Sequence, residues 1–171
     1  MDKKELMTDA VCAAAKRGLP LSVVHLTGAR DEAEIRNLYA AAGVAADVRA
    51  YESDMASLYA VSDLAVCRAG GSTCAELALF GLPALLVPFP HAAKDHQTAN
   101  AEALDRRGCA DRIAERDLTA PWLENYLAET LRRPDRLARM REAARRNGIP
   151  EGTAALADCV ERAGRGKFRE A

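Results

Sequence analysis

The stretch that decides the fold runs from Asp63 to Asn100 and reads DLAVCRAGGSTCAELALFGLPALLVPFPHAAKDHQTAN. Its first apolar run leads into a turn with two glycines and then into a helical pattern. A second apolar run, Pro83 to Phe89, leads into another helix start. Two strand–loop–helix units in succession are typical of a parallel sheet with helical crossovers. The stretch therefore predicts an α/β domain with polar side chains in both loops.

The same alternation continues on both sides of this stretch. We expect strands over residues 21–26, 46–51, 63–68, 83–89 and 110–114, the last at a sheet edge. We expect helices over residues 6–17, 31–42, 54–59, 73–80 and 95–107, and a helical pattern from residue 121 that breaks at Pro134 and near residues 148–150. Asp31, and Ser53 or Asp54, can cap the helices that follow them. The strands are near-continuous apolar runs, as expected when helices cover both faces of a sheet.

These elements predict a Rossmann-like parallel sheet flanked by helices. A doubly wound nucleotide-binding domain normally opens with a strand and a glycine-rich loop, whereas this chain opens on a polar helix. We therefore expect the first strand to be missing and its neighbour to be left unpaired. A length of 171 residues predicts one domain. We place it at residues 1–163, followed by a frayed tail at residues 164–171.

Composition narrows the function classes. A formal net charge of −1 gives no global field that would recruit nucleic acid. No apolar run approaches the ~20 residues of a membrane span, and no signal peptide is recognisable, so we expect a cytoplasmic protein. The five cysteines include no C-x-x-C pair, which argues against a zinc or redox motif and favours reduced, mostly buried thiols. The histidines have no metal-ligand spacing, and no catalytic triad is recognisable.

The turn from Arg68 to Thr73 carries the first candidate site. Its glycines let a ligand approach the backbone closely. Ser72 or Thr73 can cap the helix that follows, and the free N–H groups at that helix start can bind an anion such as a diphosphate. The alternative is a plain turn that needs glycine for its sharpness.

Glu76 lies three residues after Thr73, inside the same predicted helix. Its carboxylate can accept hydrogen bonds from the two hydroxyls of a ribose, as acidic residues do in many nucleotide-binding domains. The alternative is a capping box, in which Glu76 accepts a hydrogen bond from the Thr73 N–H. From these residues alone the capping box is the stronger interpretation.

Gln97 and Asn100 lie three residues apart at a helix start, so they share one face. Their amides suit sugar hydroxyls, and His91 and His96 lie at the mouth of the same loop. The alternative is an ordinary polar helix start with Asp95 as N-cap. The basic stretch from Arg132 to Arg146 is interpreted as a solvated helix face, with a contact to a membrane surface as the alternative.

Taken together, the motifs resemble the MurG family, whose members add N-acetylglucosamine to lipid I to form lipid II for peptidoglycan. The resemblance runs from about residue 21 to the C-terminal helices. It is strongest at YESDM (51–55), at SDLAVCRAGGSTCAE (62–76), at GLPA (81–84) with Val87-Pro88, and at His91, His96-Gln97 and Asn100. It implies the C-terminal, donor-binding half of a GT-B glycosyltransferase.

The resemblance also implies roles for particular residues. Gly70, Gly71, Ser72 and Thr73 would hold the diphosphate of UDP-N-acetylglucosamine, and Glu76 the ribose. Gln97, and less surely Asn100, would hold the N-acetylglucosamine hydroxyls. Glu52, through its backbone, and Met55 would flank the uracil. The implied substrate-binding set also includes Arg68 and His96. The resemblance implies no metal. It implies no cofactor either, because the nucleotide sugar is a substrate.

Family members have two domains, and the other one supplies the acceptor site, the catalytic base and the main membrane contact. The resemblance therefore implies no catalytic residue in this chain. It implies lipid I and the membrane as partners only when the other domain is present. Three hypotheses follow: a truncated fragment of the transferase, the donor-binding subunit of a split transferase, or a non-catalytic module that binds nucleotide sugars.

Overall fold

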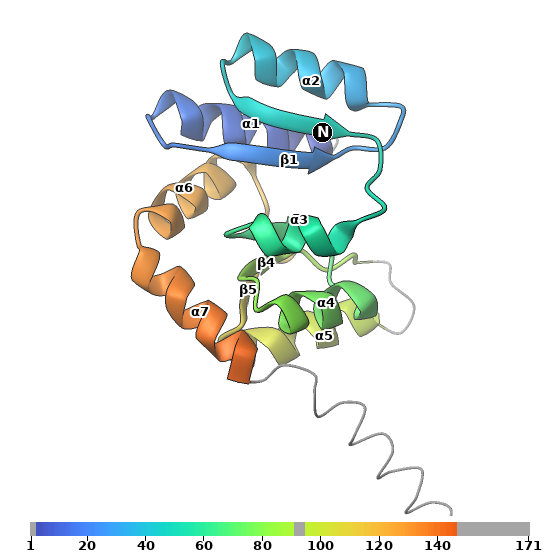
Figure 1. The fold of residues 1–171 in the computed structure, drawn as a ribbon, viewed down its shortest axis with the longest axis vertical. Coiled ribbons are helices and arrows are strands. Elements are labelled where there is room, and N and C mark those ends of the chain that lie inside the picture. The colour runs from blue at the N-terminus through green and yellow to red at the C-terminus, as the bar shows by residue number, and fades with distance from the viewer. Residues whose placement is uncertain (1–2, 91–94, 147–171) are drawn as a thin grey trace, which may run out of the picture. The chain divides into compact units, whose positions relative to one another are not determined.

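The computed structural model describes residues 3–90 and 95–146. The chain divides into two compact units, and each is described by itself. Unit 1 comprises residues 1–63 and 113–139, and unit 2 comprises residues 64–112 and 140–171. The elements of both units are coloured along the chain in Figure 1.

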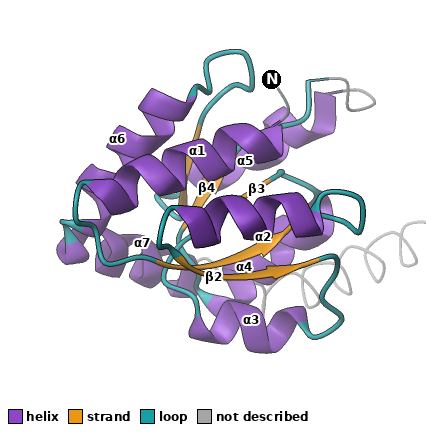
Figure 2. Cartoon of the chain, turned by 90° about the horizontal axis from the view of Figure 1, so that it is seen from above, coloured by secondary structure: helices purple, strands orange, loops and turns teal. Residues whose placement is uncertain are grey.

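Helices and strands alternate in the predicted order (Figure 2). The strands are β1 (Ser22–Leu26), β2 (Ala45–Arg49), β3 (Ala65–Cys67), β4 (Ala84–Leu86) and β5 (Ala110–Arg112). The helices are α1 (Lys3–Lys16), α2 (Glu32–Ala41), α3 (Met55–Val61), α4 (Gly71–Phe80), α5 (His96–Arg106), α6 (Ala120–Leu131) and α7 (Pro134–Arg146). The expected break near residues 148–150 lies outside the described residues. Of the described helices, none has the length and apolar character that a membrane span requires.

In unit 1, β1 and β2 pair in parallel, with Ser22 opposite Ala45 and Leu26 opposite Arg49. Helix α2 packs on β2, and α1 packs on α2 and α6. Alternate residues of β1 are exposed, including Val24 at 39% and Leu26 at 37%. The expectation that helices cover both faces of every strand is therefore wrong for β1. Successive side chains of a strand point to opposite faces, so one face of β1 is packed against the protein and the other is exposed.

In unit 2, the strand order is β3-β4-β5, and all three strands are parallel. The middle strand β4 is fully buried, with Ala84, Leu85 and Leu86 each 0% exposed. Helix α5 packs on β5, and α4 packs on α5. The predicted edge position of β5 is confirmed, because among the described strands β5 pairs with β4 alone.

The strands form two sheets rather than the single one that the sequence suggested. Within the described ranges, β1 is hydrogen-bonded only to β2, and β3 only to β4.

Gly81 ends α4 in the left-handed region, with φ of +61°. A Cβ atom there would lie 3.1 Å from the Cγ atom of Arg145 on α7. We expect Gly81→Ala to lower the free energy of unfolding by about 1–2 kcal/mol, because an L-residue is strained in this conformation. Urea denaturation measures the change. Gly71→Ala is the matched control, because a Cβ on Gly71 meets no atom within 4 Å. An equal loss in both variants would contradict the assignment of strain to Gly81.

Candidate functional site

The candidate site of unit 2 lies at the carboxyl ends of β3 and β4. Both strands are parallel, so the loops that follow them leave the sheet at the same edge. The loop after β3 leads into α4, and the loop after β4 leads toward α5. Most of the predicted site residues lie in these two loops or in the first turns of these helices.

The glycine loop differs from the prediction in where its helix begins. Helix α4 begins at Gly71, two residues before the predicted start, and its N-cap is Gly70. No side chain caps it, so the prediction that Ser72 or Thr73 does so is wrong. The first helical hydrogen bond runs from the Cys74 N–H to the Gly70 oxygen, 2.9 Å apart. The N–H groups that precede it are therefore available at the positive end of the helix dipole.

The backbone conformation bears on why two glycines stand here. Gly70 has φ of −63° and ψ of +151°, and Gly71 is not among the residues with positive φ. Any residue can adopt such a conformation, so the sharpness of the turn does not require glycine. A Cβ on Gly70 would meet only the Oγ1 atom of Thr73, at an ordinary contact distance of 3.6 Å. What the glycines provide is an uncovered backbone, as close approach of a ligand requires.

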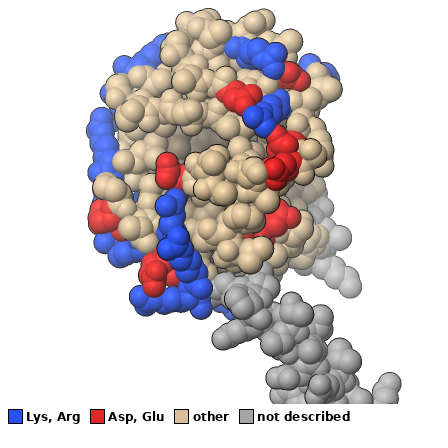
Figure 3. Space-filling view, in the orientation of Figure 1, with Lys and Arg blue, Asp and Glu red and all other residues tan. Residues whose placement is uncertain are grey.

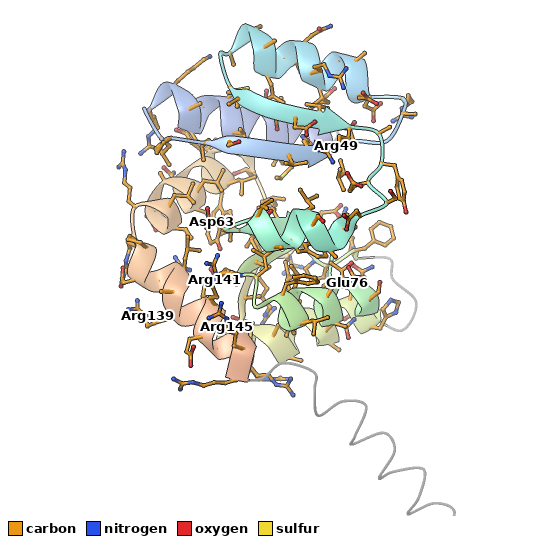
Figure 4. The ribbon with its side chains drawn as sticks, viewed as in Figure 1. Arg49, Asp63, Glu76, Arg139, Arg141 and Arg145 are labelled. Carbon is orange, nitrogen blue, oxygen red and sulfur yellow. The ribbon has the colours of Figure 1, made fainter. Side chains whose placement is uncertain are left out.

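Glu76 is the sixth residue of α4 and is half-buried (Figure 4). The capping-box alternative fails because the third helical position, where a capping glutamate would sit, is Thr73. Within the described ranges, the Glu76 carboxylate makes no hydrogen bond and no ion pair. It is thus an acceptor without a partner among the described residues, one and a half turns from the start of α4.

Arg68 joins the two loops. Its guanidinium group donates to the backbone oxygens of Val87 and Pro88, both at 3.3 Å. The same group lies 5.3 Å from the centre of the Phe89 ring, within the range of a cation–π interaction. These contacts fix the start of the loop after β4. The Arg68 guanidinium group therefore binds backbone and ring atoms of the protein itself.

Gln97 and Asn100 also contact the loops. The Gln97 Oε1 atom accepts a hydrogen bond from the Phe89 N–H at 3.0 Å. The Asn100 Nδ2 atom donates to the Ala69 oxygen at 3.0 Å. Each amide keeps its other end without a partner within the described ranges, a donor in Gln97 and an acceptor in Asn100.

The start of α5 agrees with the prediction in position. Asp95 occupies the N-cap with φ of +53°, and its Oδ1 atom accepts a hydrogen bond from the Thr98 hydroxyl at 2.6 Å. His96 is the first residue of the helix and is exposed. His91 lies outside the described residues.

Glu52 and Met55, the residues predicted to flank the uracil, belong to unit 1 and are described with that unit. The Glu52 carboxylate accepts hydrogen bonds from the Asp54 N–H and from Arg49, which also pairs with Asp47. Arg49 is labelled in Figure 4. The Asp54 N–H and Arg49 hold the pKa of Glu52 below its usual range. Asp54 caps α3 through the Ser57 N–H, which confirms one of the two predicted caps.

The cysteines in the described part of the chain show no sign of reactivity. The described ones, Cys12, Cys67, Cys74 and Cys109, form no disulfide with one another. Burial, with a smaller effect from Cys74, raises the pKa of Cys67 to about 12, so this thiol stays protonated at neutral pH. The described residues include no group of His, Cys, Asp or Glu that could hold a metal ion.

The basic stretch forms the surface of α7, and Figure 3 shows Lys and Arg side chains gathered over that helix. Two of its arginines pair with acids one turn away, Arg139 with Asp135 at 2.8 Å and Arg146 with Glu142 at 2.9 Å. A third, Arg136, lies over the Tyr126 ring. These contacts are those of a solvated helix face, the interpretation favoured from the sequence.

The fold and the loop at the helix start define the class of protein: a parallel α/β domain of the kind found in GT-B glycosyltransferases. The sequence matches the glycosyltransferase family 28 C-terminal domain over residues 3–156. The chain belongs to this family.

Curated relatives share the sequence of this region. The chain is 46% identical over 142 residues to the UDP-N-acetylglucosamine–N-acetylmuramyl-(pentapeptide) pyrophosphoryl-undecaprenol N-acetylglucosamine transferase of Anaeromyxobacter sp. (strain Fw109-5), covering 82% of this chain and 37% of that protein. It is 43% identical over 166 residues to the enzyme of the same name from Azoarcus sp. (strain BH72), covering 95% and 46%. The chain thus spans less than half the length of these relatives.

Solved structures share the fold. The crystal structure of Acinetobacter baumannii MurG aligns with a TM-score of 0.78 and 30% identity, over 92% of this chain and 48% of that one. The glycosyltransferase VinC, solved in complex with dTDP, aligns with a TM-score of 0.63 and 22% identity, over 91% and 38%, and shows the fold alone.

Proposed function

We propose that this domain binds the donor UDP-N-acetylglucosamine. The observation that carries the proposal is the uncapped start of α4, where two glycines stand although neither has a positive φ. An exposed row of N–H groups at a helix start is suited to a diphosphate. In this arrangement Gly70, Gly71, Ser72 and Thr73 hold the diphosphate.

The other roles follow the chemistry of each side chain. The carboxylate of Glu76, which has no partner in the described part of the chain, accepts hydrogen bonds from the ribose hydroxyls. The amide donor of Gln97, which has no partner among the described residues, binds a sugar hydroxyl, with His96 beside it at the helix start. In unit 1, the backbone of Glu52 and the side chain of Met55 flank the uracil. Arg68 contributes by holding the two loops together.

The proposal extends to the whole activity of the curated relatives, which are named as transferases of N-acetylglucosamine to a pyrophosphoryl-undecaprenol acceptor. The domain supplies the donor half of an inverting transfer that uses neither metal nor cofactor. Lipid I is the acceptor, and the groups that bind and activate it lie outside this chain. The reaction takes place on the cytoplasmic side of the membrane.

Isothermal titration calorimetry of the full chain tests donor binding. We expect saturable heat with UDP-N-acetylglucosamine and with UDP, because both carry the diphosphate and the ribose. N-acetylglucosamine alone lacks both groups and should give no saturable heat. Circular dichroism establishes beforehand that the chain is folded. A folded chain that gives no saturable heat with millimolar nucleotide sugar would refute the proposed function.

A further inference from the structure

We propose that Arg36 guards the outer edge of β2 against pairing with the same edge of a second copy of this chain. The inference concerns unit 1 and goes beyond the proposed function, because it does not depend on donor binding. The observation that carries it is a hydrogen bond from the Arg36 guanidinium group on α2 to the backbone oxygen of Val48 in β2, at 2.6 Å.

The Val48 oxygen lies on the side of β2 that faces away from β1. Among the described strands, β2 pairs with β1 alone. The next oxygen along the strand, that of Arg49, accepts a hydrogen bond from the Thr27 N–H directly after β1, so it faces β1. Backbone groups of successive residues alternate between the two sides of a strand, so the N–H and the oxygen of Val48 face outward. Such an edge is a template for pairing with another chain.

The sequence of β2 is complementary to itself across this edge. When two copies pair in antiparallel direction with Val48 opposite Val48, each Val48 N–H donates to the Val48 oxygen of the other copy. The same register places Asp47 opposite Arg49 of the other copy, and this happens twice because the arrangement is symmetric. Both side chains are about half exposed, Asp47 at 52% and Arg49 at 42%. The partner that fits the edge is therefore a second copy of β2.

Arg36 blocks this pairing in two ways. Its guanidinium group occupies the Val48 oxygen that the second copy needs, and it places a charge on the edge, which is a common means of preventing association between sheets. The same nitrogen atom of Arg36 also lies 2.5 Å from the carboxylate of Glu32, one turn earlier on α2. Because α2 packs on β2, this ion pair holds the Arg36 side chain over the strand.

Analytical ultracentrifugation of the full chain over a range of concentrations tests the guard. Arg36→Met keeps an apolar stem but loses every donor, and methionine retains α2 because it is a strong helix former. We expect this variant to self-associate at least about tenfold more tightly than the unsubstituted chain, since the Val48 oxygens of both copies become available. Arg36→Lys keeps a charged donor and should behave as the unsubstituted chain.

Arg139→Met is the matched control. Arg139 lies on α7 in the same unit and pairs with Asp135 one turn earlier, as Arg36 does with Glu32, but it caps no strand oxygen within the described ranges. Its substitution should leave the association unchanged. A folded Arg36→Met variant that associates no more tightly than the unsubstituted chain, or no more tightly than Arg139→Met, would overturn the inference. Circular dichroism establishes folding, and Arg36→Ala carries the same expectation if Arg36→Met does not fold.

Hydrogen exchange followed by nuclear magnetic resonance shows whether the association uses β2. In Arg36→Met, the Val48 amide should exchange more slowly as the protein concentration rises, because it then donates to the second copy. Adding Asp47→Arg to this variant places an arginine opposite Arg49 of the second copy, so the association should be lost. Association that leaves Val48 exchange unchanged, or that persists in the double variant, would refute pairing through this edge. None of these measurements uses a nucleotide, so their outcome is independent of donor binding.

Discussion

Leu85→Ala is expected to lower the free energy of unfolding by about 3 kcal/mol, the largest stability effect that we predict. Leu85 is 0% exposed in the middle of β4, which has a partner strand on each side. Truncation there removes buried apolar surface and leaves a cavity that flanking strands cannot fill, which costs about 2–5 kcal/mol in well-packed cores. Urea denaturation followed by circular dichroism measures the loss.

Leu79→Ala is the matched control for this prediction. Leu79 lies on α4 in the same unit and is 65% exposed, so its truncation should change the free energy of unfolding by less than about 0.5 kcal/mol. Similar losses at the two positions would show that β4 is not the centre of the unit 2 core.

Glu76→Ala is expected to weaken binding of UDP and of UDP-N-acetylglucosamine by about 10- to 100-fold. The reason is the loss of charge-assisted hydrogen bonds to the ribose, which contribute about 1.5–3 kcal/mol. Both ligands carry the ribose, so both should lose affinity by the same factor. Calorimetric titration of the full chain measures the change.

Two further variants sharpen this experiment. Glu76→Gln keeps one acceptor oxygen without the charge, so its loss should be smaller than that of the alanine variant. Glu34→Ala removes an exposed carboxylate from α2 and should leave the affinity unchanged. Unchanged binding by Glu76→Ala would refute the ribose role of this residue, whatever the other variants do.

The sequence predicted the fold best where one residue at one position determines the local backbone, as at helix starts and helix ends. Gly18, Gly43, Gly81 and Gly108 directly follow the helices expected over residues 6–17, 31–42, 73–80 and 95–107, and all four adopt the positive φ that is common just after a helix end. Asp54 caps α3 as predicted. Asp31 precedes α2 but its side chain makes no cap: its backbone has φ of −107° and ψ of −2°, not the extended conformation typical of a capping residue, and its carboxylate pairs with Arg30 at 2.8 Å. The residue type alone favours a cap, but the local backbone conformation decides whether one forms.

The contacts of the candidate site could be predicted only in part. The glycine loop could be located because a helix start has a local signature, whereas the ribose role proposed for Glu76 was favoured only by the resemblance to the MurG family. The bonds of Arg68 to the Val87 oxygen and of Asn100 to the Ala69 oxygen join residues 19 and 31 positions apart. Nothing in the residue types specifies such pairs, because an amide or a guanidinium group suits a substrate and a backbone oxygen equally well. The fold decides between them.

The cross-links between the loops after β3 and β4 have a consequence for the thermodynamics of binding. Arg68, Gln97 and Asn100 hold backbone groups of these loops in place without a ligand. In the described part of the loops, the conformational entropy of ordering is therefore lost during folding and not again during association. A preorganised site of this kind converts more of its contact energy into affinity. A substitution that loosens the loops adds an entropic penalty to binding, because the ligand must then order them.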